Sequence, residues 1–308
     1  MTDRPLVSVV IPMLNEADDI AGCLAAVLDQ DHPHDRLEVL VVDGGSSDAS
    51  VAIAEGVLSA THLAGWQILT NDAGITPASL NLGLAAAAGA VLCRVDARTI
   101  VQPDHVSRCV EVLTTRPDVA VVGGSQVAEA RGRDARSQGI ARTLNNRLSM
   151  GGASYRSGGT SGPADTVYLG AFRTDELRAS GGWDERFPTN QDFELNRRMG
   201  TIGQVWFDAG IRSGYLPRAE LGALYRQYVR FGRWKVRYWR ISGDAPLRRQ
   251  RRLLALPVVP LLLALVVALR RPAALVPLAA IGAVVLAGID EAGSSAQAPP
   301  RVRALSLI

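Results

Sequence analysis

The sequence predicts an α/β fold, with a mostly parallel sheet flanked by helices and a hydrophobic helical hairpin near the C-terminus. Two observations lead to this prediction. Over the first 123 residues, short apolar runs alternate with segments of helical spacing, which is typical of parallel strands joined by crossover helices. Beyond Leu253 the chain is almost continuously apolar, and it lacks the polar face that a helix packed on a soluble domain keeps.

The alternating part contains five strand-like runs and four helical patterns. The strand-like runs occupy residues 6–11, 38–42, 66–70, 91–95 and 119–122, and the helical patterns lie near residues 18–29, 48–60, 77–88 and 103–115. In the first helical pattern Ile20, Leu24 and Leu28 share one face. Pro103 stands where a first-turn proline is tolerated. We therefore expect each helix to pack on a sheet built from these strands.

The alternation ends after Gly123, and a second, shorter run of elements follows. Residues 151–163 are rich in glycine and serine and are expected to form a loop. We then expect a strand at 166–172, helices at 173–179 and 191–199, strands at 204–207 and 211–215, and an amphipathic segment at 221–241. The sequence thus predicts one domain over residues 1–245, with halves at about 1–123 and 124–245.

Two apolar stretches follow this domain, at residues 253–269 and 273–289, and each is 17 residues long. A membrane-spanning helix needs about 20 residues, so we expect a membrane-associated hairpin over 246–291 and a disordered tail over 292–308. The basic residues of 248–252 would mark its cytoplasmic side. Because Arg270 and Arg271 would then face the opposite side, a hairpin lying in the interface is an alternative. A hairpin used for oligomerisation or for the core is another.

Composition narrows the classes of protein further. Hydrophobic residues make up 47% and charged residues 20% of the 308 residues, which suits a globular domain. The formal net charge is only +3, so nucleic acid is not an expected partner. The three cysteines form no CxxC pair and are expected to be reduced and buried, as in a cytosolic domain: Cys23, Cys93 and Cys109. No signal-peptide pattern precedes the first strand, so we expect the domain to stay in the cytoplasm.

Two aspartates follow predicted strands, at the edge where open α/β sheets bind ligands. Asp43 opens the stretch Gly-Gly-Ser-Ser-Asp48, whose acids suit the base and ribose of a nucleotide. The alternative is a plain turn with a helix cap at Ser47 or Asp48. Asp96 is suited to holding a divalent cation against a diphosphate, or is simply a turn residue.

Two further stretches offer a base and phosphate ligands. Asp192 lies at a predicted helix start, where it is suited to accept a proton from a hydroxyl group but is also favoured by the helix dipole alone. Arg230 and Arg233 are three residues apart on one helical face and are suited to reach phosphates. The alternative for this stretch is a basic helix next to a membrane. Each of these signals is weak by itself.

In combination, these motifs resemble the family 2 glycosyltransferases, which have the GT-A fold with a nucleotide-binding sheet. Residues 9–16 (Val-Val-Ile-Pro-Met-Leu-Asn-Glu) and 41–48 (Val-Val-Asp-Gly-Gly-Ser-Ser-Asp) resemble the family's two nucleotide loops. Asp96 matches the first acid of its DXD element, and Gln191-Asp192 matches its acceptor-site acid pair. The stretch from Arg230 to Trp234 resembles its terminal (Q/R)xxRW element.

The resemblance covers about residues 7–240 and is strongest to bacterial exopolysaccharide enzymes that extend a lipid-linked sugar, through residues 165–170 and 181–187. Three positions depart from the family pattern. Arg98 replaces the second acid of the DXD element, which puts metal coordination in doubt. Gln191 replaces a glutamate, and Arg230 stands where glutamine is commoner.

The resemblance implies an inverting sugar transfer from a nucleotide-diphosphate donor, such as a UDP-sugar, to a glycan or lipid-linked acceptor in cell-surface polysaccharide or glycolipid synthesis. It places the enzyme at the bacterial cytoplasmic membrane, with the catalytic domain on the cytoplasmic side. Asp192 would be the base, and Asp96 would hold Mg or Mn. The resemblance assigns donor binding to Pro12, Asn15, Glu16, Asp43, Asp96 and Arg98, and diphosphate or acceptor binding to Gln191, Arg230, Arg233 and Trp234.

Other functions remain as alternatives at this stage. A nucleotidyltransferase on a similar sheet would need a glycine-rich phosphate loop with a lysine or arginine after the first strand, and residues 12–16 do not form one. A catalytically degenerate, membrane-anchored scaffold is suggested by Arg98 alone. A Rossmann dehydrogenase is disfavoured because no GxGxxG follows the first strand.

Overall fold

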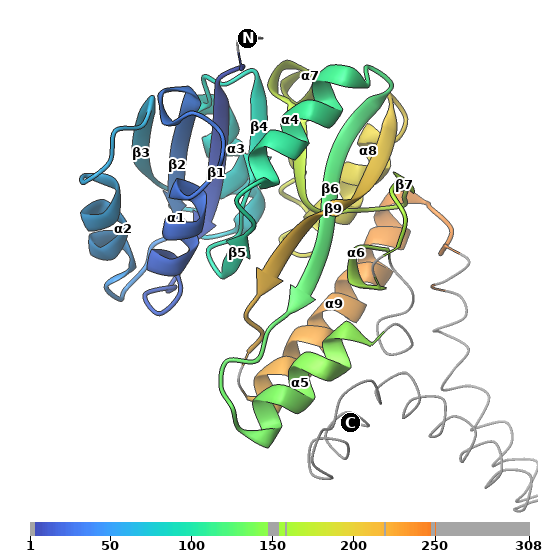
Figure 1. The fold of residues 1–308 in the computed structure, drawn as a ribbon. Coiled ribbons are helices and arrows are strands. Elements are labelled where there is room, and N and C mark those ends of the chain that lie inside the picture. Colours follow the sequence, from blue (N-terminus) through green and yellow to red (C-terminus); the bar gives the residue numbers. More distant parts are fainter. Residues whose placement is uncertain (1–3, 147–153, 158, 219, 248–249, 251–308) are drawn as a thin grey trace, which may run out of the picture.

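The structure is a computed structural model that describes residues 4–146, 154–157, 159–218, 220–247 and 250 (Figure 1). The apolar stretches at 253–289 and the predicted tail at 292–308 lie outside these residues. Within the described part, no helix is both long enough and apolar enough to cross a membrane.

The first half alternates strands and helices, as expected. Its elements are β1 (Val7–Met13), α1 (Ile20–Leu28), η1 (His34–Arg36), β2 (Leu37–Asp43), α2 (Ser50–Leu58), β3 (Gly65–Thr70), α3 (Thr76–Ala86), β4 (Val91–Arg94), β5 (Thr99–Val101), α4 (His105–Thr115) and β6 (Val119–Ala128). All nine predicted elements of this half are confirmed. The short strand β5 was not predicted, because three residues are too few to show a periodic pattern.

The second half contains more structure than its sequence indicated. Its elements are α5 (Ala135–Asn145), α6 (Ser154–Ser157), β7 (Gly162–Pro163), β8 (Tyr168–Arg173), α7 (Thr174–Ala179), α8 (Gln191–Met199), β9 (Gln204–Tyr215) and α9 (Leu221–Ser242). Helix α5 was not predicted, and α6 and β7 lie inside the stretch expected to be a loop. The two predicted strands at 204–207 and 211–215 are one strand, β9.

All strands belong to one sheet in the order β3-β2-β1-β4-β8-β6-β9-β5, with β7 paired to β9. Strands β3, β2, β1 and β4 are parallel, but β8 is antiparallel to both β4 and β6. The sheet is therefore mixed, and the prediction of a mostly parallel sheet is correct for its first four strands and for the pair β6–β9, but not for β5, β7 and β8. Because β8 comes from the second half and pairs between two strands of the first, the two halves share one continuous sheet (Figure 1).

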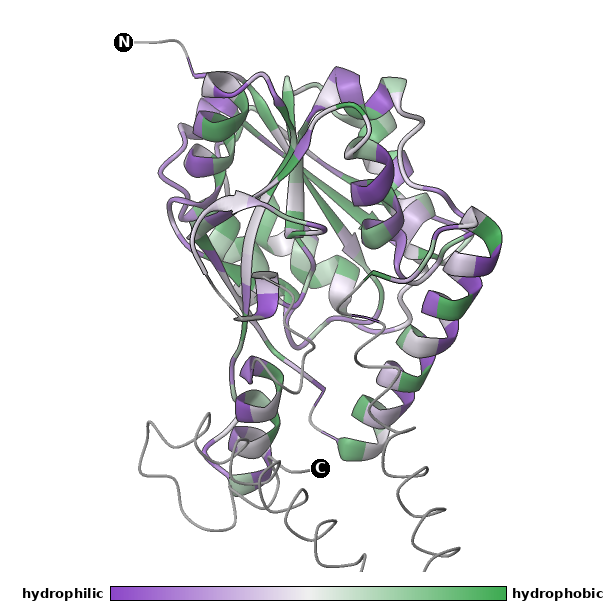
Figure 2. Cartoon of the chain, turned by 90° about the vertical axis from the view of Figure 1, so that its right-hand side faces the viewer, coloured by the Kyte–Doolittle hydropathy of each residue, from purple (hydrophilic) through white to green (hydrophobic). Residues whose placement is uncertain are grey.

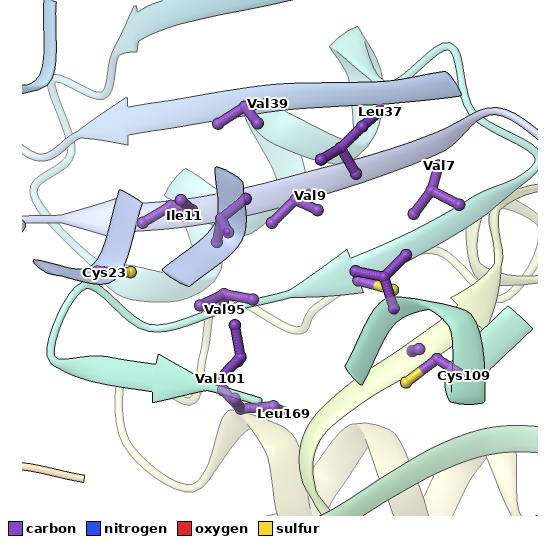
Figure 3. Close-up of a cluster of buried hydrophobic side chains, with 14 of the residues drawn as sticks. Val7, Val9, Ile11, Cys23, Leu37, Val39, Val95, Val101, Cys109 and Leu169 are labelled. Carbon is purple, nitrogen blue, oxygen red and sulfur yellow. The ribbon is translucent and has the colours of Figure 1, made fainter. Parts of the chain in front are cut away.

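The sheet has a hydrophobic layer on each face. Val7, Val9 and Ile11 of β1 point to the face covered by α1, α2 and α4 (Figure 3). Val10 and Leu40 point to the other face, covered by α3, α7 and α8. This alternation follows from the period-2 geometry of a strand that is buried on both sides. Figure 2 shows the result, with hydrophobic strands inside and hydrophilic residues on the outer helix faces.

The three cysteines lie within this core. All of them are buried and free of disulfide bonds, as the sequence predicted: Cys23, Cys93 and Cys109. Cys23 and Cys109 are labelled in Figure 3.

Strands β6 and β9 approach each other unusually closely at an irregularity in their pairing. The register shifts between Gly123 and Ser125 of β6. A Cβ atom placed on Gly124 would lie 1.9 Å from the main-chain oxygen of Ile211, so only glycine fits there. The shift lets both strands continue past the main sheet toward α5 and α9.

Helices α5 and α9 pack together beside the ends of β6 and β9 (Figure 1). Ile140 and Leu144 of α5 form a small separate core with Tyr215, against which Leu224 and Tyr228 of α9 pack. The outer face of α9 is basic and partly apolar, since Tyr225 is 72% exposed. Of these two helices, α9 forms one wall of the cavity described below.

One buried histidine is expected to make the fold acid-sensitive. His105, at the start of α4, is fully buried, and neither ring nitrogen has a hydrogen-bond partner among the described residues. Desolvation by burial lowers its pKa from 6.5 to about 4. Between these values the unfolded chain takes up a proton that the folded chain does not, so stability should fall as the pH falls from 6.5 toward 4. The expected loss is up to about 3 kcal/mol, at about 1.4 kcal/mol per pKa unit.

Urea unfolding at a series of pH values measures this effect. His105→Leu removes the titrating group and should flatten the pH dependence of the free energy of unfolding. His62→Leu is the matched control, because His62 is exposed in the loop before β3. An unchanged slope in His105→Leu would mean that other groups cause the acid sensitivity.

Candidate active site

A cavity of about 450 Å³ opens at the carboxyl ends of β1 and β4. Its walls come from the loops after these strands, the start of α8, the short helix α6 and one face of α9. The cavity brings together seven of the predicted site residues, which are Pro12, Glu16, Asp96, Arg98, Gln191, Asp192 and Arg230. Four do not line it: Asn15, Asp43, Arg233 and Trp234.

Arg94 connects the two aspartates of the cavity. It is the last residue of β4, and its side chain is only 6% exposed. Its Nε donates to Oδ1 of Asp96 at 2.7 Å, and its Nη1 donates to Oδ1 of Asp192. Desolvation acts to lower the pKa of Arg94, but the charges of Asp192 and Asp96 outweigh it and raise the pKa, so the residue stays cationic. One guanidinium group thus fixes the strand-end acid and the helix-start acid relative to each other.

The start of α8 presents Asp192 to the cavity. Asn190 precedes the helix with a left-handed backbone (φ 68°), and its Nδ2 donates to the main-chain oxygen of Phe231 on α9 at 3.2 Å. Burial raises the pKa of Asp192, Arg94 opposes this rise and Asp96 adds to it. Although the cavity walls desolvate the carboxyl group, 45% of the side chain is exposed to the cavity. A carboxylate with a raised pKa that remains accessible to ligands is suited to act as a general base.

Trp183 lies next to this base. Its indole N–H acts to lower the pKa of Asp192, the weakest of the influences on that group. The indole nitrogen Nε1 is buried and makes no hydrogen bond of normal geometry among the described residues. The main-chain N–H and oxygen of Trp183 are both bonded to the Asn81 amide of α3, each at 2.8 Å. The Trp183 ring packs edge-on against Phe172. These contacts fix the indole against the helix that carries Asp192.

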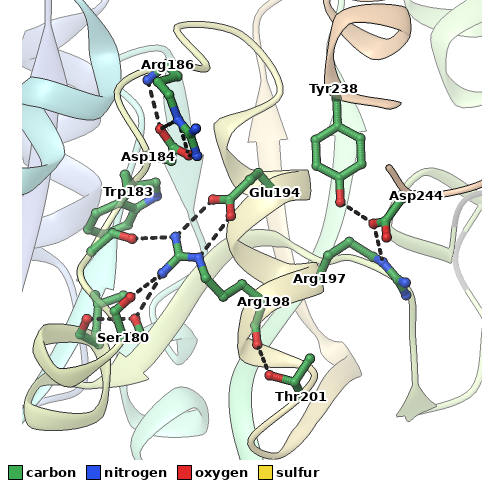
Figure 4. Close-up of polar contacts among 12 residues, drawn as sticks. Ser180, Trp183, Asp184, Arg186, Glu194, Arg197, Arg198, Thr201, Tyr238 and Asp244 are labelled. Atoms are coloured by element: carbon green, nitrogen blue, oxygen red, sulfur yellow. Dashed lines mark hydrogen bonds and ion pairs between the residues drawn. The ribbon is translucent and has the colours of Figure 1, made fainter. Parts of the chain in front are cut away.

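Arg198 holds the glycine turn in front of Trp183 (Figure 4). Its Nη2 donates to the oxygen of Gly182 at 2.7 Å, and its Nη1 donates to that of Ser180. The same guanidinium group pairs with Glu194, one turn further back on α8. This network explains why residues 181–187, which carried part of the family resemblance, lie next to Asp192 without lining the cavity themselves.

Arg98, the departure from the DXD pattern, lies on the loop between β4 and β5. Its Nε forms an ion pair with Oε1 of Glu16 at 3.3 Å. Desolvation raises the pKa of Glu16, and Arg98 is the strongest of the charges that oppose the rise. Arg218 lies near enough to feel these charges. Desolvation lowers its pKa, and the positive charges of Arg98 and Arg230 lower it further. Positive charge therefore gathers where the second acid of the pattern would stand.

Asn15 and Asp43, which were predicted to belong to the nucleotide loops, do not line the cavity but bond to the main chain of residues 45–47. Oδ2 of Asp43 accepts hydrogen bonds from the N–H groups of Gly45 at 3.1 Å and Ser46 at 3.0 Å. Oδ1 of Asn15 accepts from the N–H of Ser47 at 2.8 Å, which ties the two loops together. The hydrogen bonds of Asp43 are those of a turn, which was the alternative to a nucleotide-binding role. A donor contact of either side chain stays a prediction.

Arg233 and Trp234 lie on α9 away from the cavity. Arg233 is exposed, one turn beyond Arg230. Trp234 is partly buried and packs on the aromatic cluster of Phe187, Phe193 and Tyr238. Since Phe193 itself lines the cavity, Trp234 supports the wall from outside. Their predicted roles in phosphate and acceptor binding remain predictions.

Sequence reasoning missed three basic residues that line the cavity, Arg94, Arg156 and Lys235. Arg94 carried a signal, since it is the one charged residue in the apolar run 91–95 that was expected to be a buried strand. Burying a charge is costly unless it is paired, so such a residue points to acidic partners. Arg156 carried no signal, because it lies in the stretch expected to be a loop.

The cavity offers limited ligands for a metal ion. Within the described residues, no group of three or more acidic, histidine or cysteine side chains is placed to hold one. Asp96 lines the cavity, and Arg94 occupies only its Oδ1. Mg²⁺ is commonly held by one or two carboxylates together with substrate phosphates. The residues therefore fit a cation shared with a diphosphate, and they do not form a complete protein cage.

Solved structures identify the class of this fold. The chain is similar to the mannosyltransferase PcManGT of Pyrobaculum calidifontis, solved with GDP-Man and Mn²⁺, with a TM-score of 0.68 and 21% identity over 99% of this chain and 86% of that one. This similarity shows that the chain has the GT-A-like fold of glycosyltransferases. Residues 8–166 match the family model described as glycosyl transferase family 2, and the chain belongs to that family.

Characterised relatives agree with this assignment. The succinoglycan biosynthesis protein ExoA of Rhizobium meliloti (strain 1021) is 31% identical over 273 residues, covering 87% of this chain and 80% of the relative. A dolichyl N-acetyl-alpha-D-glucosaminyl phosphate glucuronosyltransferase of Methanococcus voltae is 25% identical over 234 residues, covering 73% and 71%. The chain is a glycosyltransferase that uses a nucleotide-sugar donor. Family membership also decides against the nucleotidyltransferase alternative.

Replacing Arg94 should loosen both acids at once. Arg94→Met leaves Asp96 and Asp192 without their shared cation, and we expect transfer to fall by about tenfold or more. The free energy of unfolding should fall by about 1–2 kcal/mol, less than for a fully buried pair because both acids are partly exposed. Steady-state transfer and urea unfolding measure the two effects.

Arg94→Lys and Arg136→Met are the controls for this prediction. Lysine keeps the charge but lacks the fork that reaches two carboxylates, so an intermediate rate is expected. Arg136 forms an exposed ion pair with Glu220, and its replacement should change neither quantity appreciably. Equal rates for Arg94→Met and the wild type would show that the bridge does not matter for transfer.

Proposed function

We propose that this enzyme transfers a sugar, with inversion, from a nucleoside-diphosphate donor to a hydroxyl group of a lipid-linked or glycan acceptor in cell-surface polysaccharide synthesis. The observation that carries the proposal is the ion-paired arrangement of Asp96, Arg94 and Asp192 in one cavity. It places an accessible carboxylate with a raised pKa on the same cavity wall as a strand-end acid.

In this proposal, Asp192 takes the proton of the acceptor hydroxyl as the hydroxyl oxygen bonds to the anomeric carbon. The bond from that carbon to the diphosphate oxygen breaks on the opposite face of the sugar, which inverts the anomeric centre. Negative charge then collects on the departing diphosphate, and Arg98, which lines the cavity, stabilises it in this proposal. Arg94 keeps Asp192 oriented toward the cavity.

Asp96 is the residue proposed to hold a divalent cation, Mg²⁺ or Mn²⁺, together with the donor phosphates. Such a cation would neutralise charge on the diphosphate. Asp96 is the single carboxylate proposed to bind the cation, because Glu16 is paired with Arg98. The remaining ligands of the cation would come from the donor phosphates. The mannosyltransferase with the similar fold was solved with Mn²⁺, which supports the proposal.

The acceptor is proposed from the relatives. One is named for succinoglycan biosynthesis and another for a dolichyl-linked sugar phosphate. Both names point to sugar chains assembled on a carrier or exported as polysaccharide. A lipid-linked saccharide is therefore the acceptor we propose, and a UDP-sugar the first donor to test.

Purified full-length protein offered a panel of UDP- and GDP-sugars with a lipid-linked saccharide extract tests the function. Release of nucleoside diphosphate should occur with one donor and should depend on the extract. NMR of the product should show the opposite anomeric configuration to the donor. Retained configuration would contradict the inverting mechanism, and no release with any donor would contradict the function.

We also propose that the protein attaches to the cytoplasmic membrane through residues 246–291, with the catalytic domain on the cytoplasmic side. The outer face of α9 supports this, since it combines arginines with the exposed side chains of Tyr225, Val236 and Ile241. The full chain should stay in the membrane fraction after both high-salt and carbonate washes. Release by high salt alone would show that attachment is electrostatic, through residues 248–252, and that the hairpin prediction is wrong.

A variant that lacks residues 253–308 is the control for this attachment. It should appear in the soluble fraction and should give the same circular dichroism per folded residue, because every cavity-lining residue found in the structure precedes that point. Its activity on a lipid-linked acceptor should fall, since the encounter within the membrane plane is lost.

A further inference from the structure

One cavity residue has a charge that the described protein does not neutralise. Arg156 of α6 lines the cavity, and its Nε and Nη1 atoms are buried without a hydrogen-bond acceptor in the described chain. An unsatisfied buried polar group is uncommon and costly, and a charged one more so. Such a group in a binding cavity is explained if a ligand supplies the missing acceptor.

The surroundings of Arg156 are aromatic. Its guanidinium carbon lies 5.5 Å from the ring centre of Tyr155 and 6.0 Å from that of Tyr215. Tyr228 of α9 is also near enough to influence it electrostatically. The described residues provide no aspartate or glutamate within ion-pair distance of Arg156. A hydrogen bond with the side chain of Tyr155 helps to raise the pKa of Arg156, but Nε and Nη1 still have no acceptor among the described residues.

The carboxylates of the cavity are already paired with other arginines. Each carboxylate found in its lining already has a protein cation, since Glu16 pairs with Arg98 and both aspartates pair with Arg94. Arg230 resembles Arg156 in having no carboxylate partner among the residues described. The cavity thus carries at least two positive charges beyond what its own acids balance.

An unsatisfied acceptor lies on the same wall. Gln227, one turn before Arg230 on α9, lines the cavity with its Oε1 buried and without a donor within the described structure. A guanidinium group needs an anion, while an amide oxygen needs a donor such as a sugar hydroxyl. A ligand that carries a phosphoryl group next to a sugar satisfies both.

We infer that Arg156, with Arg230 and Gln227, binds the phosphoryl group and adjoining sugar of a lipid-linked acceptor, apart from the donor diphosphate. This inference rests on the proposed function and names a substrate class for it. All three residues come from the second half of the chain, as Asp192 does, whereas Asp96 and Arg98 follow β4 of the first half. Helix α9 also leads toward the basic and apolar residues beyond 247.

Calorimetry on the detergent-solubilised full chain tests the inference. The protein is first saturated with UDP or GDP, whichever binds, and is then titrated with geranyl pyrophosphate. The wild type should bind this second ligand, and geraniol, which lacks the phosphoryl groups, should not compete. Arg156→Gln should weaken binding on the order of tenfold to a hundredfold while nucleotide affinity stays within about threefold.

Two variants control for charge and folding. Arg226→Gln makes the same change at an exposed position of α9 that does not line the cavity, and it should bind both ligands as the wild type does. Arg156→Lys keeps the charge without the planar fork and should lose less affinity than Arg156→Gln. If Arg156→Gln does not fold, Arg156→Lys decides, since unchanged geranyl pyrophosphate affinity in that variant would overturn the inference.

The failures of the two proposals are distinguishable. Equal weakening of nucleotide and geranyl pyrophosphate in Arg156→Gln would assign the residue to the donor diphosphate and overturn the inference, with the glycosyltransferase function intact. Unchanged binding of both, or no second binding event in the nucleotide-saturated wild type, would also overturn it. A wild-type protein that binds no nucleotide would instead contradict the proposed function.

Discussion

Asp192→Asn is expected to lower turnover by at least about a hundredfold, because a general base contributes roughly 10²–10⁴ to the rate of a reaction. Asp192 is the carboxylate at the start of α8, and its raised pKa suits it to remove the acceptor proton. The amide keeps the shape of the side chain but cannot take that proton. Steady-state release of nucleoside diphosphate measures the loss.

Nucleotide binding separates this effect from a folding defect. Calorimetric affinity for the donor nucleotide should stay within about threefold of the wild type, because the loss acts on the chemical step. Asp175→Asn is the matched control, since Asp175 lies in the first turn of α7 with a side chain that is 96% exposed. Near-normal turnover in Asp192→Asn would remove Asp192 from the role of base.

An excess of chelator is expected to stop transfer, and added Mg²⁺ or Mn²⁺ should restore it. The reason is that Asp96 offers one free carboxylate oxygen beside the position proposed for the diphosphate, where a cation would neutralise the leaving group. Initial rates of nucleoside diphosphate release across a range of metal concentrations measure this. Asp96→Asn should raise the metal concentration needed for half-maximal rate.

Chelator that is already saturated with Mg²⁺ is the control and should leave the rate unchanged. Full activity in excess free chelator would contradict the metal proposal. It would instead support a metal-free site in which Arg98 carries part of the charge, as the replacement of the second DXD acid suggested. The Arg98–Glu16 pair would then have to open when the donor binds.

Much of the fold could be predicted from sequence because its signals are local. The helices and strands of the first half follow from apolar periodicity, and α8 begins at Gln191 as predicted. The order of β8 in the sheet could not be predicted, because its pairing with β4 and β6 is decided by contacts between distant segments. The mixed character of the sheet follows from that insertion and from β5 and β7, which are antiparallel to β9.

The candidate site divides in the same way. Asp96 and Asp192 were recognisable because acids at a strand end and a helix start have a local signature. Arg94 became interpretable only when the structure placed it between them, 98 residues apart in sequence from Asp192. Asn15 and Asp43 matched the family pattern, yet their side chains bond within the loops behind the cavity.

The sequence by itself determined the α/β elements of the first half and the motifs that indicate the family, since these depend on spacing within a few turns or strands. Only the tertiary structure decided which charges have partners. Arg94 and Arg156 are both arginines of the cavity, but one lies between two acids and the other among tyrosines. The ion-pair partner of a buried charge can be far away in the chain, so only the folded structure shows whether that charge is paired.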